Sequence, residues 1–424
     1  MGYRVPSSGV LTLLICSAFA NTAFAGGLER GGYDIDLLFD KSRYAFEAGV
    51  TYVMPDRRLK NAHDVNPADG DLNGRSSSVR DTENYAVPYF GVKIGLTDDI
   101  DCLADYSEPF GAHSNPGTNW AGANYDVETK LKTHNYGLTC SYKFDAGPGD
   151  IRLIGGGFYQ EVEGFKEQVV LPAGTPLGPG IFNPSDDTGT LNVQDHGWGW
   201  RGGLAYEIPE YAFRASLIYN SQVKYDGLSG TVDLTSVPAV LGAPFGVVTP
   251  VYGQATAPDS LELKLQSGIA PDWLAFGSVK WTNWSVLQSV PFCATATRGI
   301  VSCVPGSAAK ITSLDLLYRD GWTITGGVGH QFNDKWSGAV SLTWDRGTAA
   351  MDYGIASDTW TLGAGVSYKP TEHVEFRFAG AVGLLTSGHS GTVVSNGVTY
   401  GNDVTYSYGN DFVGALSTSM KVTF

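Results

Sequence analysis

Fourteen segments of this chain alternate between apolar residues and polar or small residues, and this alternation constrains the fold more than any other feature. A period of two residues is that of a β-strand with two different faces. In segment 44–54 the even positions are all apolar or aromatic, whereas the odd positions are mostly small or polar. The pattern recurs, with varying clarity, in residues 86–96, 100–110, 128–144, 151–162, 191–207, 211–226, 261–269, 273–284, 320–332, 336–345, 360–368, 374–384 and 410–424.

Short and long connections between these segments alternate in order. The six short connections are turns near residues 97–99, 145–149, 208–210, 271, 333–335 and 369–373. The seven long connections span residues 55–84, 111–127, 164–190, 227–257, 289–319, 347–357 and 386–409. An even strand number with long loops at one end only is typical of bacterial outer-membrane barrels. We therefore expect an all-β fold, a transmembrane antiparallel β-barrel of 14 strands over residues 44–424, with a soluble β-sandwich as the alternative.

The last segment indicates which face meets lipid. Its apolar face carries Phe412, Leu416, Met420, Val422 and Phe424, and its polar face carries Asp411, Ser417, Ser419 and Lys421. Because a charged side chain in hydrocarbon is costly, we expect the polar face to line the lumen. The outward register of the terminal Phe424 is that of barrels recognised by the cell's barrel-insertion machinery. Aromatic residues near strand ends would form the interfacial girdles, among them Trp273, Trp336, Trp344, Trp360 and Tyr368.

Residues 1–25 have the pattern of a secretory signal peptide. Arg4 precedes an apolar stretch over residues 10–19, and Ala23-Phe24-Ala25 is a small-x-small cleavage site. Such a stretch is too short to span a bilayer, which needs about 20 apolar residues. Removing Arg4 with the peptide changes the net charge from -15 to -16, and this acidity argues against a nucleic-acid partner. We expect a monomer in the outer membrane of a Gram-negative cell, in contact with its lipid and lipopolysaccharide.

Segment 26–43 precedes the first strand and is too long for a simple leader. It contains the apolar triplet Leu37, Leu38 and Phe39, which would be exposed to water in a free tail. We therefore expect these residues to form a short hatch that folds back into the lumen. A disordered tail is the alternative.

Two consecutive long loops are unusually apolar for segments in water. Loop 227–257 contains the run VPAVLGAPFGVV at 237–248, and its predecessor is loop 164–190. Exposed apolar patches of this size mark binding surfaces. We predict that a hydrophobic ligand is captured there by Val169, Val170, Leu171, Ile181, Phe182, Val240, Leu241, Phe245 and Val247. The alternative is that the two loops pack on each other or on lipopolysaccharide acyl chains.

A ligand with a carboxylate also needs a cation or a donor. Residues of the predicted lumen face include Arg152, Arg201, Arg214, Lys264, Lys280 and Arg377. The acidic neighbours Glu262 and Glu375 indicate that most of these cations are solvated wall charges. We predict Arg214 and Lys264 as head-group ligands, because their strands flank loop 227–257.

Four cysteines of the mature chain allow three pairings. Cys293 and Cys303 lie in one loop, so a local disulfide is favoured, whereas Cys102 and Cys140 on neighbouring strands either pair or stay free. Asp69, Asp71 and Asn73 resemble the start of a calcium loop, but Arg80 occupies the position of its bidentate Glu. A flexible polar loop is the preferred interpretation, and we expect no metal and no cofactor.

Two other classes of function, an enzyme and a diffusion porin, compete with binding of an apolar ligand. The motif nearest to a nucleophile elbow, residues 388–392, reads GHSGT, fails G-x-S-x-G at its last position and lies in a loop. We therefore expect no enzymatic activity. A general diffusion porin for small polar solutes remains open, although its mouth would be lined by charge rather than by apolar loops.

Several motifs together resemble the FadL family of outer-membrane transporters. They follow the expected order from the third segment to the tenth: YSEPFG at 106–111, WGWRGGLAYE at 198–207, YAFR at 211–214, YNSQVK at 219–224, WTNWS at 281–285 and DGW at 320–322. The resemblance implies a fourteen-stranded barrel with an N-terminal hatch. It also implies uptake of long-chain fatty acids or other hydrophobic compounds, including aromatic hydrocarbons in the TodX-like branch.

The resemblance further implies a path for the ligand. It would be captured between the third and fourth outer loops, here 164–190 and 227–257, and would enter an inner pocket beside the hatch. It would then leave laterally at a distorted third strand, where Glu108-Pro109 is compatible with a break in the ladder. Residues 26–43 are shorter than the hatch of the family and lack its Asn-Pro-Ala motif. The sequence therefore does not decide how tightly the lumen is sealed or how it is gated. The choice between fatty acid and aromatic hydrocarbon is also open, because both need only an apolar trough.

Overall fold

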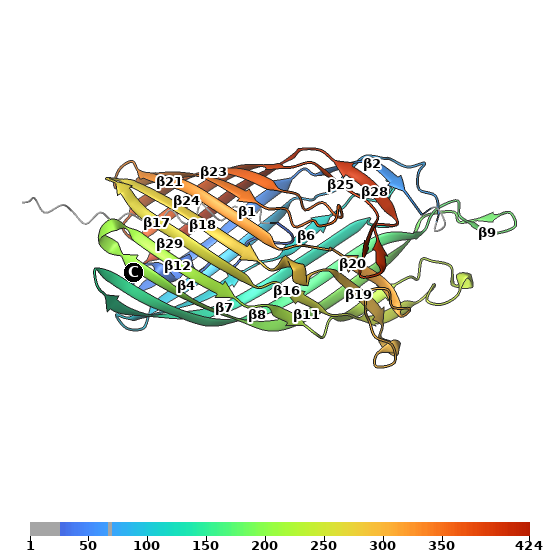
Figure 1. The fold of residues 1–424 in the computed structure, drawn as a ribbon, viewed down its shortest axis with the longest axis horizontal. Coiled ribbons are helices and arrows are strands. Elements are labelled where there is room, and N and C mark those ends of the chain that lie inside the picture. The colour runs from blue at the N-terminus through green and yellow to red at the C-terminus, as the bar shows by residue number, and fades with distance from the viewer. Residues whose placement is uncertain (1–25, 67–69) are drawn as a thin grey trace, which may run out of the picture.

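The computed structural model describes residues 26–66 and 70–424. The predicted signal peptide, residues 1–25, and Asp69 of the calcium-like sequence lie outside the described residues. The chain is a long β-barrel whose strands are tilted relative to its long axis, with turns at one end and extended loops at the other (Figure 1). Pairing of β1 (Tyr44–Pro55) with β29 (Asp411–Thr423) closes the barrel. Among the residues described, no helix is long and apolar enough to cross a membrane.

Fourteen antiparallel strands form the barrel wall, and each predicted segment overlaps one of them. Between β1 and β29 lie β4 (Tyr85–Gly95), β5 (Ile100–Ser107) continued by β6 (Gly111–Ser114), β7 (Glu128–Ala146), β8 (Gly149–Leu171), β11 (Asp187–Ile208), β12 (Phe213–Asn220), β17 (Ser260–Ala270), β18 (Trp273–Thr282), β21 (Gly321–Gln331), β22 (Trp336–Asp345), β23 (Thr359–Thr371) and β24 (Val374–Leu385). The predicted all-β barrel is confirmed. Short turns and long loops alternate as expected.

The two faces of the strands are those predicted from the last segment. In β29, Phe412 is 63% exposed on the outside, whereas Lys421 is 6% exposed on the inside. Aromatic pairs lie at both ends of the outer face. Trp336 packs against Tyr368 near the turns, and Trp344 lies beside Trp360 near the loops. This arrangement matches the interfacial girdles of a membrane barrel.

The segment before β1 lies inside the barrel. Its one helical turn, η2 (Asp36–Phe39), buries Leu38 and Phe39 against lumen-facing residues of the wall: Leu103, Ile154, Ala205 and Ile218. Leu37 packs at the edge of this cluster. Polar groups surround the cluster, because the wall here is lined by charged strand residues. The segment predicted to form the hatch therefore lies in the lumen with Leu38 and Phe39 buried, and its action as a plug stays a prediction.

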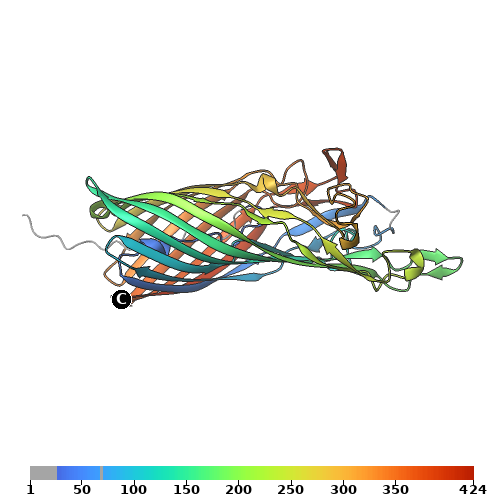
Figure 2. The same cartoon turned by 90° about the horizontal axis from the view of Figure 1, so that it is seen from below.

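Strands β8 and β11 continue far beyond the barrel and end in a small hairpin of β9 (Pro176–Gly178) and β10 (Ile181–Phe182), which projects beyond the other loops (Figures 1 and 2). Beside them, β14 (Ser229–Asp233), β15 (Val248–Tyr252), β19 (Ser289–Ala294) and β20 (Lys310–Asp315) extend the same sheet. Strand β13 (Val223–Tyr225) pairs with β16 (Ala255–Ala257) at the base of these loops.

A second group of loop strands covers the other side of the barrel mouth. It is a sheet of β2 (Arg58–Asp64), β3 (Val79–Arg80), β25 (Gly388–Ser390) and β28 (Val404–Tyr408). The small pair β26 (Val393–Ser395) and β27 (Val398–Tyr400) lies next to it in the chain. The sheet packs on a buried cluster that includes Leu59, Trp120 and Tyr406. The loops therefore form a structured cap rather than free segments.

Two disulfides are present: the favoured pair Cys293–Cys303, and Cys102–Cys140, for which the sequence left pairing and free thiols open. Cys293 is bonded to Cys303 within one outer loop, and Cys102 of β5 is bonded to Cys140 of β7. Cys102 and Cys140 are direct cross-strand partners in the barrel wall. The interpretation of these residues as free thiols is therefore excluded. The first disulfide restrains a loop, whereas the second restrains the wall.

Candidate functional site: an apolar path from the outer loops to the wall

A groove of about 550 Å³ lies between three of the outer loops. Its apolar lining includes the predicted residues Val170 and Phe245, together with Leu191, Val232, Leu234 and Ile311. Among the described residues that line it, Lys166 and Lys310 are the charged ones. The volume falls in the range of about 300–1,000 Å³ that is usual for small-molecule sites. A mostly apolar groove with two cations is suited to an amphipathic ligand with an anionic head.

The other predicted outer residues lie outside the groove lining. Val169 and Leu171 are buried on the opposite face of β8, because successive strand residues point to opposite sides. Ile181 and Phe182 are exposed on β10 in the projecting hairpin, and Val240 is 84% exposed. The remaining two, Leu241 and Val247, are about half exposed near the groove-lining Phe245. Their role in capture stays a prediction.

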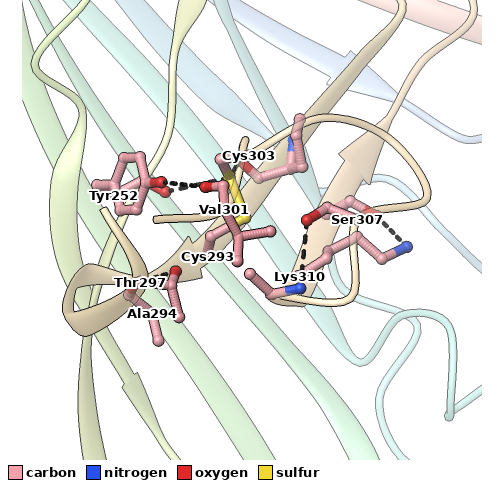
Figure 3. The surroundings of a disulfide bond; sticks show 11 residues. Tyr252, Cys293, Ala294, Thr297, Val301, Cys303, Ser307 and Lys310 are labelled. Atoms are coloured by element: carbon pink, nitrogen blue, oxygen red, sulfur yellow. Dashed lines mark hydrogen bonds between the residues drawn. A yellow bond between two sulfur atoms is a disulfide. The ribbon is translucent and has the colours of Figure 1, made fainter. Parts of the chain in front are cut away.

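The third wall of the groove comes from loop 289–319, which the apolar-run argument missed. Ala294, Thr297 and Lys310 line the groove from this loop. The Cys293–Cys303 disulfide lies between Ala294 and Thr297 on one side and Lys310 on the other, with Tyr252 of β15 next to it (Figure 3). The paired cysteines were the available signal for this wall, since a restrained loop presents a fixed surface. Apolar runs alone do not identify it.

A smaller cavity of about 90 Å³ lies directly below the groove, within the barrel mouth. Its lining is almost entirely apolar and includes Leu28 of the hatch, Phe110, Val162, Trp284 and Phe292. Lys166 and Leu191 line both the groove and this cavity. The Lys166 ammonium donates a hydrogen bond to the backbone carbonyl of Ser313 at 3.2 Å and lies 5.5 Å from the Tyr125 ring centroid. Lys166 therefore stands between the two spaces.

The third wall strand is broken beside this cavity. Strand β5 ends at Ser107, β6 begins at Gly111, and β4 pairs with β5 only from Phe90 onward. Pro109 lies in the break and cannot donate to a ladder. The Glu108 carboxylate within it is buried and accepts from Lys132 at 3.1 Å and from the Tyr106 hydroxyl at 3.0 Å. The distortion expected at Glu108-Pro109 is therefore present in the wall.

The hatch fills this break from the lumen side. Arg30 N–H donates to the Pro109 carbonyl at 2.8 Å, and Gly111 N–H donates to the Leu28 carbonyl at 2.7 Å. The Arg30 guanidinium lies 4.0 Å from the Tyr85 ring centroid. A Cβ at Gly111 would lie 2.6 Å from the Arg30 Nε, so a larger residue there would displace the buried Arg30 side chain. The hatch thus acts as a short strand that completes the wall.

Arg214 and Lys264, the predicted head-group ligands, contact the hatch. Both pair with Asp36, at 3.7 Å for Arg214 and 3.2 Å for Lys264. The Arg214 guanidinium also lies 4.3 Å from the Phe39 ring centroid. Neither residue lines the groove or the cavity above it. Their observed contacts anchor the plug, and a direct role in ligand binding stays a prediction.

The two motifs held as minor alternatives lie in the cap. The Asp71 carboxylate accepts the Asn73 N–H, and the Asn73 carboxamide bonds the Asp64 carbonyl, so both side chains complete a turn. Calcium binding there stays untested. In the serine motif, His389 is exposed near Asp352, whereas Ser390 is buried and accepts the Gly354 N–H. The serine and histidine point to opposite faces of β25, which does not suit a nucleophile and its base.

Known proteins share this sequence and fold. The chain is 25% identical to the long-chain fatty acid transport protein of Escherichia coli O6:H1 over 81% of its length and 77% of that protein. It is 24% identical to the protein of the same name from Salmonella typhi, over 81% and 78%. A Pseudomonas aeruginosa FadL homologue has a TM-score of 0.73 at 17% identity, covering 95% of this chain and 97% of that chain. The Pseudomonas putida toluene transporter TodX has a TM-score of 0.59 at 14% identity, covering 96% and 98%.

The two solved structures compare folds only, since their identities are low. A family model covers most of the chain: residues 37–376 match the family described as "Outer membrane protein transport protein (OMPP1/FadL/TodX)". This range runs from the hatch to the penultimate barrel strand, β24. The chain therefore belongs to the OMPP1/FadL/TodX family, whose members transport hydrophobic compounds across the outer membrane.

Proposed function

We propose that the protein takes up long-chain fatty acids, which bind in the outer groove, pass through the inner cavity and leave laterally through the break in the wall. The observation that carries this proposal is the continuity of the two apolar spaces, which share Lys166 and Leu191 as lining. The curated relatives are fatty acid transport proteins and support the same substrate.

Capture begins in the groove because it is the larger and more accessible space. An acyl chain gains about 25 cal/mol for each Å² of apolar surface removed from water. The apolar lining from Val170, Phe245 and Ile311 supplies that surface. Lys310 at the exposed rim attracts the carboxylate first, and Lys166 receives it at the entrance to the inner cavity. The acyl tail of the ligand then enters the inner cavity before its carboxylate does.

Exit follows from the position of the inner cavity beside the break. Leu28 of the hatch and Phe110 of the wall both line the cavity. Phe110 forms a β-bridge with Glu29, the residue after Leu28, across the break. Movement of hatch residues 28–31 would open the cavity towards the membrane, because these residues complete the wall through backbone hydrogen bonds. The hatch core at Leu38 and Phe39 keeps the lumen below closed during this step. We therefore propose lateral exit rather than passage to the periplasm through the barrel.

Uptake of aromatic hydrocarbons is the second candidate. The inner cavity favours it, because a cavity of about 90 Å³ with apolar walls suits a single ring as well as part of an acyl chain. A solved toluene transporter shares the fold.

A general diffusion porin is disfavoured by the hatch, which occupies the lumen with the Leu38 cluster and several ion pairs. Export by a cleaved signal peptide, insertion through Phe424, contact with lipopolysaccharide and a monomeric state remain predictions.

Binding of radiolabelled oleate to the refolded barrel, with toluene as competitor, tests the proposal. We expect saturable oleate binding that toluene displaces weakly. Replacing Lys166 by Gln should weaken oleate binding about tenfold and leave toluene binding unchanged, because only the acid has a head group for the ammonium. Strong toluene binding without saturable oleate binding would favour the hydrocarbon instead. Absence of both would contradict a carrier for apolar compounds.

A further inference from the structure

Among the residues that the structure describes, the buried side chain of Arg201 on β11 has no hydrogen-bond partner. Its side chain has no exposed surface, and none of its three guanidinium nitrogens has a hydrogen-bond partner among the residues described. Its one ionic neighbour is Asp105, with 3.5 Å between Nη1 and Oδ1, and both Asp105 oxygens also lack hydrogen bonds within the described chain. A buried charged group in this condition carries a large desolvation penalty. The fold retains the guanidinium despite that cost.

Two other lumen arginines, Arg152 and Arg377, show how such a group is satisfied by hydrogen bonds. Arg152 donates to Glu207, Asp101 and Ser141 at 3.0, 2.7 and 2.9 Å. Arg377 donates to Glu375 and Glu47 at 2.7 and 2.9 Å. These two residues act as wall charges in closed networks. Arg201 differs from them by having donors free for a further acceptor.

Two rings pack on the Arg201 guanidinium: Phe158 of the wall at 5.3 Å and Tyr33, which belongs to the hatch. The Tyr33 ring lies 5.5 Å from the Arg201 guanidinium and packs against Phe110, which lines the inner cavity. Its hydroxyl accepts a hydrogen bond from Gln160 at 2.9 Å. Gln160 in turn accepts one from Tyr225, another residue of the cavity wall. Tyr33 therefore covers Arg201 and is held in place by the wall of the cavity.

Arg201 is also close to the proposed exit. Its ionic neighbour Asp105 lies on β5, three residues before Glu108 in the break. The hatch residues that fill the break, 28–31, are directly followed in the chain by the segment that carries Tyr33. Withdrawal of this part of the hatch would therefore open the break and uncover Arg201 together.

We propose that Arg201 binds the carboxylate of the fatty acid between the inner cavity and the break, once Tyr33 has moved aside. This inference rests on the proposed uptake of fatty acids and adds a second head-group site below Lys166. A guanidinium presents two parallel N–H donors to a carboxylate, and such bonds are among the strongest in proteins. The site therefore favours a carboxylate over a neutral ligand of the same length, and toluene would gain nothing from it.

The test compares laurate with 1-dodecanol, which have the same chain length but differ in charge. Binding of each to the refolded barrel is measured for the wild type, Arg201→Gln and the matched control Arg152→Gln. We expect Arg201→Gln to weaken laurate binding about tenfold, with dodecanol unchanged. Arg152→Gln removes an equally buried lumen charge away from the path and should leave the laurate-to-dodecanol affinity ratio unchanged.

A variant of the cover gives the opposite sign and does not depend on the folding of Arg201→Gln. Tyr33→Ala uncovers Arg201 and should raise the laurate-to-dodecanol ratio, whereas Tyr33→Ala combined with Arg201→Lys should lose most of that gain. Equal effects of Arg201→Gln on both ligands, or no effect of either change on the ratio, would overturn the assignment while leaving fatty acid uptake intact. A wild type that binds neither ligand would overturn the uptake proposal itself.

Discussion

The turn-side half of the lumen and the loop-side half are built from opposite chemistry. On the turn side the hatch is fixed by charge: Asp36 meets Arg214 and Lys264, and Asp40 accepts from Lys421 at 2.8 Å. On the loop side the core is a continuous apolar cluster that includes Phe110, Trp284 and Phe292, with the groove and the inner cavity at its surface. One chain thus closes its barrel with ion pairs and receives ligand on apolar surface.

The difference follows from the directionality of the two interactions. Buried ion pairs need defined geometry and are costly to separate, so they suit a part that must stay closed. Apolar contact is not directional, and a ligand slides along it without losing specific partners. The hatch joins the two halves, because its residues 28–31 complete the wall above while Asp36–Phe39 anchor it below. Sealing of the lumen and binding of the ligand can therefore be tested separately.

The largest effect is expected from breaking the charged anchor. Replacing both Arg214 and Lys264 by Gln removes two ion pairs of Asp36. The hatch should then loosen and the lumen should conduct ions. Single-channel recording in a planar bilayer should show steady open conductance for the double variant and a closed wild type. A double variant that stays closed would mean that the Leu38 cluster alone holds the hatch.

Next in size is the effect of charge in the groove. Val170→Asp and Phe245→Asp each place a carboxylate in the apolar lining, where it is poorly solvated and repels the ligand head group. We expect each to weaken oleate binding at least about tenfold without opening the lumen. Val394→Asp is the control, since Val394 of β26 is 65% exposed and does not line the groove. Equal losses for all three variants would point to a general effect on the loops.

A smaller effect is expected from the loop disulfide. Replacing Cys293 and Cys303 by Ser frees the third wall of the groove and should weaken oleate binding a few-fold, by raising the entropy lost when that wall is ordered. The matched control replaces Cys102 and Cys140, whose bond lies in the barrel wall. Replacing this pair should lower the unfolding temperature and leave oleate binding unchanged. The reverse assignment of effects would contradict the role given to loop 289–319.

The smallest effect concerns the cap beside the groove. Burial raises the pKa of Asp81 to about 7, with the nearby Asp126 also raising it and Arg57 lowering it. An unfolded Asp titrates near pH 3.9, so the folded cap loses stability as pH rises from about 4 to about 7 and no further above that. Asp81→Asn should remove this loss. Hydrogen exchange of the Asn115 N–H, which donates to the Asp81 carbonyl, reports the opening.

Most of the barrel could be predicted from the sequence, because lipid and lumen impose opposite demands on alternate residues. The clean alternation in β29, ending on Phe424, is a direct trace of that demand. The break at Glu108-Pro109 was also visible, since proline interrupts a ladder wherever it falls. The apolar triplet at Leu37, Leu38 and Phe39 indicated the hatch for a similar reason, because only a buried site explains it.

The contacts of the lumen could not be predicted in the same way. Arg214 and Lys264 were chosen by their position beside an apolar loop, but their ion pairs join strands to a hatch residue more than 170 positions away in the chain. Lys166 and Arg201 are distinguished only by their surroundings. Lys166 lines both the groove and the inner cavity, and the Arg201 guanidinium lacks hydrogen bonds among the described residues. Such pairings depend on register across the barrel, which residue spacing does not encode.

The most direct test of the division between the two halves is oleate binding to the Arg214→Gln, Lys264→Gln double variant. If capture belongs to the loop side and sealing to the turn side, the opened barrel should bind oleate in the outer groove with an affinity close to that of the wild type. Loss of oleate binding in a variant that still folds and conducts would contradict the account, because the charged anchor would then belong to the binding site.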